Sequence, residues 1–416
     1  MTASLRGASW LTTGGAARTL ALLDGNGEEA RVVGGAVRNA LMDLPVGEID
    51  IATTALPEEV IRRAAAARIK SIPTGIEHGT VTLVVDGRPF EITTLREDVE
   101  TFGRKAKVAF GRDWTRDAER RDFTINGLSV SGDGTVHDHI GGLDDIAARR
   151  VRFIGDPDRR IAEDYLRILR FFRIHAAYGA GDPDRAGYLA CIRGRAGLAT
   201  LSAERLRAEM LKLLVADGAI EAVVAMGDGG LLLAILGGIT FSGPLAAMIT
   251  AEHTLGLTPD PIRRLAALAV SVTEDARRIA QRLRLSNAEA KQLDSMGHRW
   301  WRLGGMDEAT ARRRLYRLGA PRYRDRLMQG WARAGRDADP TLWQSLVTLP
   351  QRWQPPTFPL KAADFITRGI AEGPALGHVL TIAEDAWLAA DFPLDSAQLA
   401  AIADQTVARF RRDHRL

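Results

Sequence analysis

The stretch ARVVGGAVRNALMDLPVGEIDIAT, residues 30–53, decides the fold of the first part of this chain. Ala30 to Val33 form a short run typical of a strand, Gly34-Gly35 is a turn, and Ala36 to Met42 begins a helix. A second strand is expected at Ile49 to Thr53. This order of strand, glycine turn, helix and strand predicts a small α/β module.

The following residues extend this module to about residue 140. Pro57 is suited to the first turn of a helix at Glu58 to Ala67. Two further strands, Val81 to Val85 and Phe90 to Thr94, flank Asp86-Gly87, a dipeptide that favours a tight hairpin.

From about residue 161 the pattern becomes helical almost to the end of the chain, so the fold class is α+β. Apolar side chains at helical spacing predict a helix with one buried stripe, formed by Ile161, Tyr165, Ile168, Leu169 and Phe172. Ser202 is the expected N-cap of a second helix, Ala203 to Leu214. Gly- and Pro-rich stretches at 227–244 and 257–261 indicate module boundaries.

The composition bounds the class of protein. A chain of 416 residues exceeds one core, and 56 Lys and Arg against 52 Asp and Glu favour phosphate-bearing partners. The single cysteine, Cys191, excludes an intrachain disulfide and a Cys-based zinc cluster, and it fits a reducing compartment. No apolar run accompanies Arg6 and Arg18, so we expect a cytoplasmic protein without a signal peptide.

One uncharged stretch, Gly229 to Ala251, has the length to span a bilayer. Gly237-Gly238 and Ser242-Gly243-Pro244 divide it into short pieces, and no second span accompanies it. We therefore expect buried helices here and no membrane partner.

Two carboxylates flank Ile49. Strand alternation predicts that Glu48 and Asp50 share one face, where their repulsion favours a divalent cation. Glu91, in the later strand of the hairpin, is a candidate third carboxylate. An acid-x-acid pair is also common on protein surfaces, so this pattern alone leaves the metal site open.

The Gly34-Gly35 turn between strand and helix is a candidate phosphate cradle, and Arg38 lies one helical turn later. A simple tight turn is the alternative. The G-x-G-x-x-G pattern of a dinucleotide-binding fold is absent here.

Four motifs then occur in a specific order. They are VGGAVR at 33–38, EID at 48–50, RRDFTIN at 120–126 and EDYLRILR at 163–170, followed by LSAER at 201–205. In these residues the chain resembles the bacterial class II tRNA nucleotidyltransferases, the CCA-adding enzymes of the polymerase-β-like superfamily. The same group contains bacterial poly(A) polymerases, and the likeness covers roughly residues 30–215.

The resemblance implies a polymerase-β-like nucleotidyltransferase head followed by helical modules. The expected divisions are a catalytic head at 1–150, a helical neck with the base-reading motif at 151–220, a helical body at 221–305 and a tRNA-binding helical tail at 306–416.

The resemblance also implies roles for individual residues. The expected catalytic residues are Glu48, Asp50 and Glu91, of which Glu48 and Asp50 are the implied metal ligands. The expected nucleotide-binding residues are Gly34, Gly35, Arg38, Arg121, Asp122, Asn126, Asp164, Arg167 and Arg170. Asp98 and Arg104 fall in a stretch similar to the family's flexible loop, which helps the final adenosine addition. Position 48 departs from the family's usual Asp, and Asn39 stands where the family usually has Asp.

The expected base choice has a physical basis. Asp164 and Arg167 are three residues apart, which predicts one face of a helix. A carboxylate only accepts hydrogen bonds and a guanidinium only donates them. Cytosine and adenine present an amino donor beside a ring-nitrogen acceptor, whereas uracil and guanine reverse both groups. A pair of this kind selects CTP and ATP without a template. An ordinary i,i+3 surface ion pair is the alternative.

The resemblance therefore predicts a Mg²⁺-dependent enzyme that adds C, C and A to tRNA from CTP and ATP. A poly(A) polymerase or a partial A- or CC-adding relative stays open as an alternative, as does a non-catalytic RNA-binding protein on a decayed head. Arg312 to Arg314 are candidate RNA contacts. The aromatic pair Trp300-Trp301 is expected to pack in a core.

Overall fold

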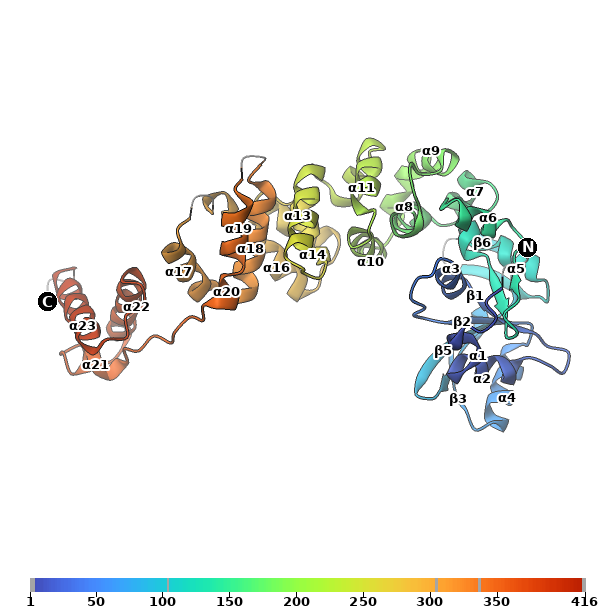
Figure 1. The fold of residues 1–416 in the computed structure, drawn as a ribbon, viewed down its shortest axis with the longest axis horizontal. Coiled ribbons are helices and arrows are strands. Elements are labelled where there is room, and N and C mark those ends of the chain that lie inside the picture. The colour runs from blue at the N-terminus through green and yellow to red at the C-terminus, as the bar shows by residue number, and fades with distance from the viewer. Residues whose placement is uncertain (1–3, 103–104, 304–305, 336–337, 414–416) are drawn as a thin grey trace. The chain divides into compact units, whose positions relative to one another are not determined.

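The computed structural model describes residues 4–102, 105–303, 306–335 and 338–413, without the side chains of 97–108. The chain forms two compact units. The first unit contains residues 1–240 and 282–284, and the second contains 241–281 and 285–416. Figure 1 labels many of the helices and strands of both.

A seven-stranded mixed sheet organises the first unit, with strand order β3-β4-β5-β2-β1-β8-β9. Its strands are β1 (Ala30–Val33), β2 (Asp50–Thr53), β3 (Lys70–Gly75), β4 (Thr80–Val85), β5 (Arg88–Thr94), β8 (Ser129–Ser131) and β9 (Val136–His137). The β2 and β5 strands are parallel, and the other neighbours are antiparallel. The predicted α+β class, the two early strands and the hairpin around residues 86–87 are confirmed.

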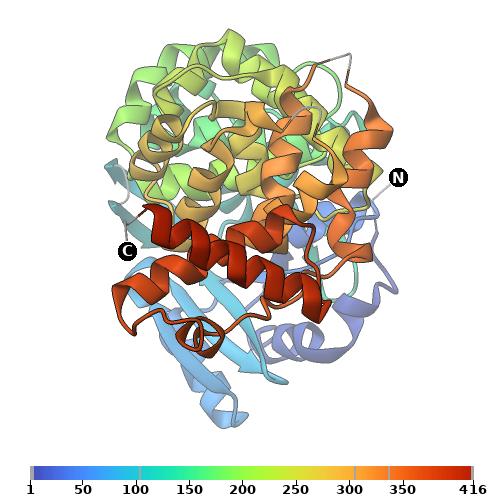
Figure 2. The same cartoon turned by 90° about the vertical axis from the view of Figure 1, so that its left-hand side faces the viewer.

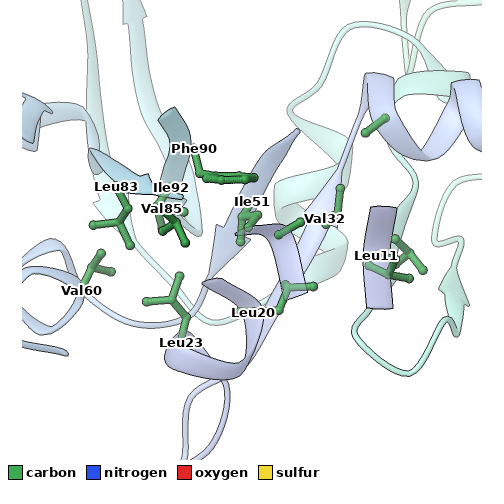
Figure 3. Close-up of a cluster of buried hydrophobic side chains, with 14 of the residues drawn as sticks. Leu11, Leu20, Leu23, Val32, Ile51, Val60, Leu83, Val85, Phe90 and Ile92 are labelled. Carbon is green, nitrogen blue, oxygen red and sulfur yellow. The ribbon is translucent and has the colours of Figure 1, made fainter. Parts of the chain in front are cut away.

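Short helices complete this α/β region. They are α1 (Ser9–Thr12), α2 (Gly14–Leu23), α3 (Gly35–Leu41), α4 (Pro57–Ala66), α5 (Trp114–Glu119) and α6 (Gly142–Ala147), with 3-10 turns η1 (Ile76–His78) and η2 (Thr124–Asn126). Figure 3 shows the core, where Leu20 and Leu23 from α2 meet Ile51, Leu83 and Ile92 from the sheet. Alternate residues of β4 are buried, which is the pattern of a strand with one covered face.

A separate two-stranded sheet pairs β6 (Arg96–Phe102) with β7 (Lys105–Phe110). Asp98 lies in β6. Arg104, the second expected residue of the flexible loop, lies outside the described residues.

Helices form the rest of the first unit. They are α7 (Pro157–Glu163), α8 (Leu166–Tyr178), α9 (Arg185–Arg193), α10 (Ala203–Leu214), α11 (Ala219–Asp228) and α12 (Leu231–Leu236), with a 3-10 segment η3 (Gly194–Thr200). The expected helix at residues 203–214 is confirmed. Its predicted cap is wrong in one respect, because the Ser202 side chain makes no capping hydrogen bond.

The prediction of one continuous helix through residues 161–172 is wrong. Asp164 is extended (φ −156°, ψ 107°) and separates α7 from α8. Its Oδ1 accepts a hydrogen bond from the Leu166 N–H at 3.1 Å. Aspartate competes for nearby backbone donors in this way, and helical spacing alone does not reveal the interruption.

The second unit is helical. It contains α13 (Ser242–Thr254), α14 (Pro261–Ala269), α15 (Thr273–Arg282), α16 (Asn287–Gly297), α17 (Glu308–Leu318), α18 (Ala320–Arg333), α19 (Pro340–Val347), α20 (Leu349–Arg352), α21 (Ala362–Ile366), α22 (Pro374–Ala389) and α23 (Ser396–Asp413), with a 3-10 turn η4 (Trp300–Arg302). Val379 and Ala383 of α22 join Ala403 and Val407 of α23 in one core cluster, and Figure 2 shows the two helices side by side.

The uncharged stretch at 229–251 falls in α12 and α13, and the apolar side chains Leu231, Leu232 and Leu245 in it are buried. Within the described part of the chain, no helix is both long and apolar enough to cross a membrane.

The expectation that Trp300 and Trp301 both pack in a core is wrong for Trp301. Trp300 is anchored, because its Nε1 donates to the Ser271 carbonyl at 2.8 Å. Trp301 stands edge-on to it at 5.8 Å between ring centres and is 53% exposed.

A buried ionic network links three helices of the second unit. Glu252 is 1% exposed, and its two oxygens accept hydrogen bonds from Arg263 Nη1 and Arg264 Nε, each at 2.7 Å. Asp325 Oδ1 also accepts from Arg263 Nε at 3.2 Å. Buried guanidinium groups need carboxylates close by, so α13, α14 and α18 are held in one arrangement.

Replacing Glu252 by Gln keeps the side-chain shape but removes the charge between two buried guanidinium groups. Breaking a buried ion pair costs about 3–5 kcal/mol, so the free energy of unfolding of this unit should fall by about 3 kcal/mol. Urea denaturation followed by tryptophan fluorescence measures the change. Glu372→Gln, at an exposed position, is the matched control and should stay within about 0.5 kcal/mol of the parent. Equal effects of the two substitutions would show that the network adds no stability.

Candidate functional site

An open cavity of about 590 Å³ lies in the first unit. It is lined by Gly34, Gly35, Arg38, Glu48, Asp50, Arg121, Asp122, Asn126, Asp164, Leu166, Arg167, Arg170, Arg173, Ile174, Arg205 and Lys212. Every residue that the sequence predicted to bind nucleotide lines it. The folded chain therefore brings together residues that are up to 178 positions apart, from Gly34 to Lys212.

Carboxyl groups gather at one side of the cavity. Asp50 is the first residue of β2, and its register partner in the parallel strand β5 is Glu91. Burial raises the pKa of Asp50, and the charge of Glu48 raises it further, while Arg121 opposes the change. The pKa of Glu91 is raised by burial, by Asp50 and by Glu48. The three carboxyl groups are thus electrostatically coupled, although Glu91 is not among the residues that line the cavity.

The expected strand alternation of Glu48 and Asp50 is wrong in one respect. Because β2 begins at Asp50, Glu48 lies in the segment before the strand. Both residues still line the cavity.

These carboxyl groups suit a divalent cation that also binds phosphate. Along the described residues, no three Asp, Glu, His or Cys side chains converge into a complete metal cage. Mg²⁺ seldom uses such a cage, because it keeps waters and binds one or two carboxylates together with substrate phosphates. Repulsion that raises the pKa values of Asp50 and Glu91 is the condition that a bound cation relieves.

The glycine turn is packed against two guanidinium groups. Gly34 has φ +72°, and a Cβ there would lie 3.4 Å from Arg121 Nη1. A Cβ on Gly35 would lie 3.5 Å from Arg38 Nη2. A Cβ at either position would be in ordinary van der Waals contact with a guanidinium, so the positive φ of Gly34, rather than a lack of space, favours glycine at the start of the turn.

Arg38 is held without a carboxylate partner among the described residues. Its guanidinium lies 3.6 Å from the centre of the Tyr178 ring and donates to the side-chain oxygens of Asn39 and Asn126. Burial lowers its pKa, and the positive charges of Arg173 and Arg170 lower it further. Asn39, which stands where the family usually has Asp, also donates to the Pro45 carbonyl at 2.9 Å.

The RRD motif is held by carboxylate pairs. Asp117 accepts from Arg120 Nε at 2.7 Å and from Arg121 Nη2 at 3.0 Å. Asp122 Oδ2 accepts from Arg170 Nε at 2.8 Å, while its Oδ1 accepts from Asn126 Nδ2 at 3.2 Å. Burial raises the pKa of Asp122, but the charge and hydrogen bonds of Arg170, together with hydrogen bonds from Asn126 and the Phe123 N–H, hold that pKa below the usual range.

The two expected base-reading residues are not on one helix and do not pair with each other. Asp164 Oδ2 accepts from Arg205 Nη2 at 2.6 Å. Arg167 Nη1 donates to Glu163 Oε2 and to the Arg160 carbonyl, each at 2.6 Å. Each residue therefore has its own anchor, and both side chains line the same cavity.

Sequence reasoning missed the contribution of α10 to the site. Arg205 and Lys212 line the cavity, and Glu209 between them accepts from Arg173 Nε at 2.5 Å. Residues 205, 209 and 212 have the spacing of one helical face, and this spacing is the signal in the sequence that could have indicated their shared position. The helix was predicted, but nothing in its sequence indicates which other helix it faces.

The conformation around Asp164 also depends on a close contact. A Cβ on Gly197 would lie 2.1 Å from the Tyr165 ring, so the ring lies directly against the glycine. Tyr165 joins Asp164 to α8, and this contact fixes the residue that follows the break between helices.

Comparisons with known proteins agree with this geometry. Residues 30–152 match the family model of the poly A polymerase head domain. The mitochondrial CCA tRNA nucleotidyltransferase 1 of Danio rerio is 33% identical over 393 residues, which cover 91% of this chain and 88% of the relative. The CCA-adding enzyme of Geobacillus thermodenitrificans is 40% identical over 214 residues, about half of either protein.

Solved structures show the same fold. The Bacillus stearothermophilus CCA-adding enzyme in complex with CTP aligns with a TM-score of 0.72 at 25% identity, over 95% of this chain and 98% of that one. The Thermotoga maritima CCA-adding enzyme complexed with tRNA aligns with a TM-score of 0.69 over 94% of each chain. At 18% identity, this second likeness supports the fold alone.

The fold and the site define a nucleotidyltransferase with a polymerase-type head, a class that generally uses a divalent metal. More particularly, identity of 33% along most of both chains shows that this chain belongs to the CCA tRNA nucleotidyltransferase family, whose bacterial members are the CCA-adding enzymes.

The Asp122–Arg170 pair predicts a pH-dependent stability. Because the folded-state pKa of Asp122 is lowered, the pair stabilises the fold above the unfolded-state pKa near 3.9 and loses its effect as pH falls below that value. Asp122→Asn should therefore destabilise the first unit at pH 7, and the difference from the parent should shrink toward pH 3.

Hydrogen exchange of the β-sheet amides follows the first unit separately from the second. Asp133→Asn is a comparison at an exposed loop position, where hydrogen bonds from Thr135 are the main cause of the lowered pKa and the charges of Arg6 and His137 add to it. The assigned ion pair would be contradicted if the difference in the free energy of unfolding between Asp122→Asn and the parent stayed constant from pH 7 to pH 3.

Proposed function

We propose that this protein adds C, C and A in turn to the 3′ end of tRNA, using CTP and ATP with Mg²⁺ and no nucleic-acid template. The observation that carries the proposal is the single cavity in which the carboxylates Glu48 and Asp50 lie with the base-reading candidates Asp164 and Arg167. The named activities of the relatives, which include CCA-adding enzymes solved with CTP, ATP and tRNA, support it.

In the proposed reaction the terminal hydroxyl of the RNA attacks the α-phosphate of the nucleotide in line. A bond forms between the 3′ oxygen and the α-phosphorus, and the bond from that phosphorus to the bridging oxygen breaks. Pyrophosphate leaves with the electron pair, and the hydroxyl loses its proton. Positioning and charge neutralisation supply most of the rate enhancement in such transfers.

The residues divide this work. Glu48 and Asp50 would hold the metal, with Glu91 as the third carboxylate beside them. Bound Mg²⁺ supplies positive charge next to the phosphates. Gly34 and Gly35 leave room for the triphosphate between Arg38 and Arg121.

The remaining residues are proposed to contact the sugar and the base of the nucleotide. Asp122 and Asn126, which are joined by a hydrogen bond, would hold the ribose, and Arg170 fixes Asp122 through their ion pair. The described hydrogen bonds of Arg167 all use Nη1, which leaves Nη2 and Nε to donate to a ring nitrogen. Asp164 retains lone pairs beside Arg205 to accept from an amino group. Asp98 and Arg104 belong to the stretch proposed to assist addition of the final A.

Incubation with tRNA that ends at its discriminator base, with Mg²⁺ and each nucleotide separately and together, tests the proposal. CTP alone should add two residues, ATP alone should add none, and both should give CCA. A long A tail would indicate a poly(A) polymerase, and incorporation of only A or only C would indicate a partial enzyme. No incorporation by the parent would indicate a non-catalytic RNA-binding protein. Asp50→Asn serves as the inactive control.

The choice of nucleotide tests the proposal that Asp164 and Arg167 select the base. Two buried mismatched contacts of about 1–3 kcal/mol each select C and A over U and G by roughly 100-fold. Asp164→Ala removes one contact, so the ratio of UTP to CTP incorporation should rise by roughly tenfold while some transfer remains. Unchanged preference would refute the role of Asp164.

Arg205 is a positioning residue in this scheme, because it contacts Asp164 rather than the base. Arg205→Gln should relax the choice less than Asp164→Ala and leave the thermal midpoint of unfolding nearly unchanged. Arg193→Gln is the matched control, since Arg193 is 57% exposed in its pair with Asp158 and lies outside the cavity.

A further inference from the structure

A break separates the two helices that carry the proposed base-reading residues. Helix α7 ends at Glu163, helix α8 begins at Leu166, and the extended residue Asp164 lies between them. The helical ladder of backbone hydrogen bonds is interrupted at such a break, so side chains must help to fix one helix against the other. Arg160, Glu163 and Arg167 form a bridge of this kind.

The guanidinium of Arg167 reaches back from α8 to α7. Its Nη1 donates to Glu163 Oε2 and to the carbonyl of Arg160, each at 2.6 Å. A hydrogen bond to a carboxylate is charge-assisted and is stronger than one between neutral groups. The orientation of Arg167 in the nucleotide cavity therefore depends on where the last turn of α7 lies.

The Arg160 side chain attaches this turn to the RRD motif. Arg160 is 9% exposed, and its Nη1 donates to Glu163 Oε2 at 2.6 Å. Its Nη2 donates to the backbone carbonyls of Arg120 and Arg121. Arg121 and the next residue, Asp122, line the nucleotide cavity. One guanidinium thus joins the segment proposed to hold the phosphates and the sugar to the segment that anchors the proposed base reader.

Arg160 itself is not among the residues that line the nucleotide cavity. It can affect a bound nucleotide only through the residues that it holds. Arg160 and Arg167 donate to the same oxygen of Glu163, whose other oxygen lies 3.6 Å from Nε of Arg159, a side chain that is 82% exposed. Loss of the Arg160 guanidinium would release Glu163 toward Arg159 and solvent, and the anchor of Arg167 would move with it.

We propose that Arg160 is a positioning residue that sets nucleotide choice by holding Arg167 in register with the RRD motif. The proposal rests on the proposed function, because only there does Arg167 donate to the ring nitrogen of the base. Hydrogen bonds weaken steeply when their geometry is lost. A loosened Arg167 would donate less well to cytosine and adenine, and it would oppose the ring N–H of uracil and guanine less strongly.

Equilibrium binding of each nucleotide to the full chain, measured by calorimetry with Mg²⁺ and without tRNA, tests the proposal. The readout is the ratio of the Kd for UTP to the Kd for CTP. Arg160→Gln should lower this ratio by roughly tenfold, because one of the two selective contacts is loosened. Arg160→Lys keeps the charge but lacks the guanidinium fork, so it should lower the ratio by roughly threefold. The lysine variant keeps the test decisive if Arg160→Gln unfolds.

Arg159→Gln is the matched control, because Arg159 is the adjacent residue of α7 and contacts the same carboxylate from an exposed position. It should leave all four Kd values at the parental level. A purely structural role of Arg160 would weaken the binding of all four nucleotides by one common factor. An unchanged ratio of Kd values in the two Arg160 variants would therefore overturn the proposal.

A double variant tests whether Arg160 acts through Arg167. Arg160→Gln/Arg167→Gln should have the same ratio of Kd values as Arg167→Gln alone, because the second change removes the residue through which the first one acts. Effects on the ratio that multiply in the double variant would show that Arg160 acts by another route, and this result would refute the assigned role.

The binding ratio depends on neither tRNA nor catalysis. If the parent protein prefers CTP and ATP but does not extend tRNA, the proposed function fails, and the ratios of the Arg160 variants still decide the role of Arg160. If the parent adds CCA while both Arg160 variants keep the parental ratio, only the role of Arg160 is refuted. A parent that binds all four nucleotides equally would refute the base-reading role of Arg167 and, with it, this role of Arg160.

Discussion

Electrostatic repulsion among arginines is the constraint on which the site depends. Arg121, Arg167, Arg170, Arg173 and Arg205 all line one cavity, and each is held by a carboxylate of the protein. Without these carboxylates the guanidinium groups would separate and the cavity would lose its shape. Arg38 differs, since its partners are two neutral side-chain amides and an aromatic ring. Its charge therefore stays available to an anionic ligand.

The sheet supplies the opposite charge in the same place. Parallel pairing of β2 with β5 puts Asp50 beside Glu91, and the antiparallel pairing of β1 with β2 brings the glycine turn after β1 close to both. The carboxylates Glu48 and Asp50 thus lie in the same cavity as the arginines. A nucleoside triphosphate with a divalent cation is complementary to such a cavity, because phosphates need cations and the metal needs carboxylates.

The two units treat positive charge differently. In the first unit most site arginines are compensated by carboxylates and are fixed in position, which suits selective contacts with one base. In the second unit a single carboxylate, Asp294, lines one open cavity together with four cations, Arg277, Lys291, Arg322 and Arg326, among the described residues. The difference is one of geometry, since both units are rich in arginine.

The sequence by itself determined the local elements and the chemical inventory. Alternation and turn residues predicted β1, β4 and β5, and motif order predicted a set of nucleotide-binding residues that all line one cavity. Only the tertiary structure decided which charges meet. The break at Asp164, the Arg205 anchor and the exposure of Trp301 depend on contacts between segments far apart in the chain. Local periodicity reports which face of a helix is apolar, but not which partner faces it, so these features follow from packing alone.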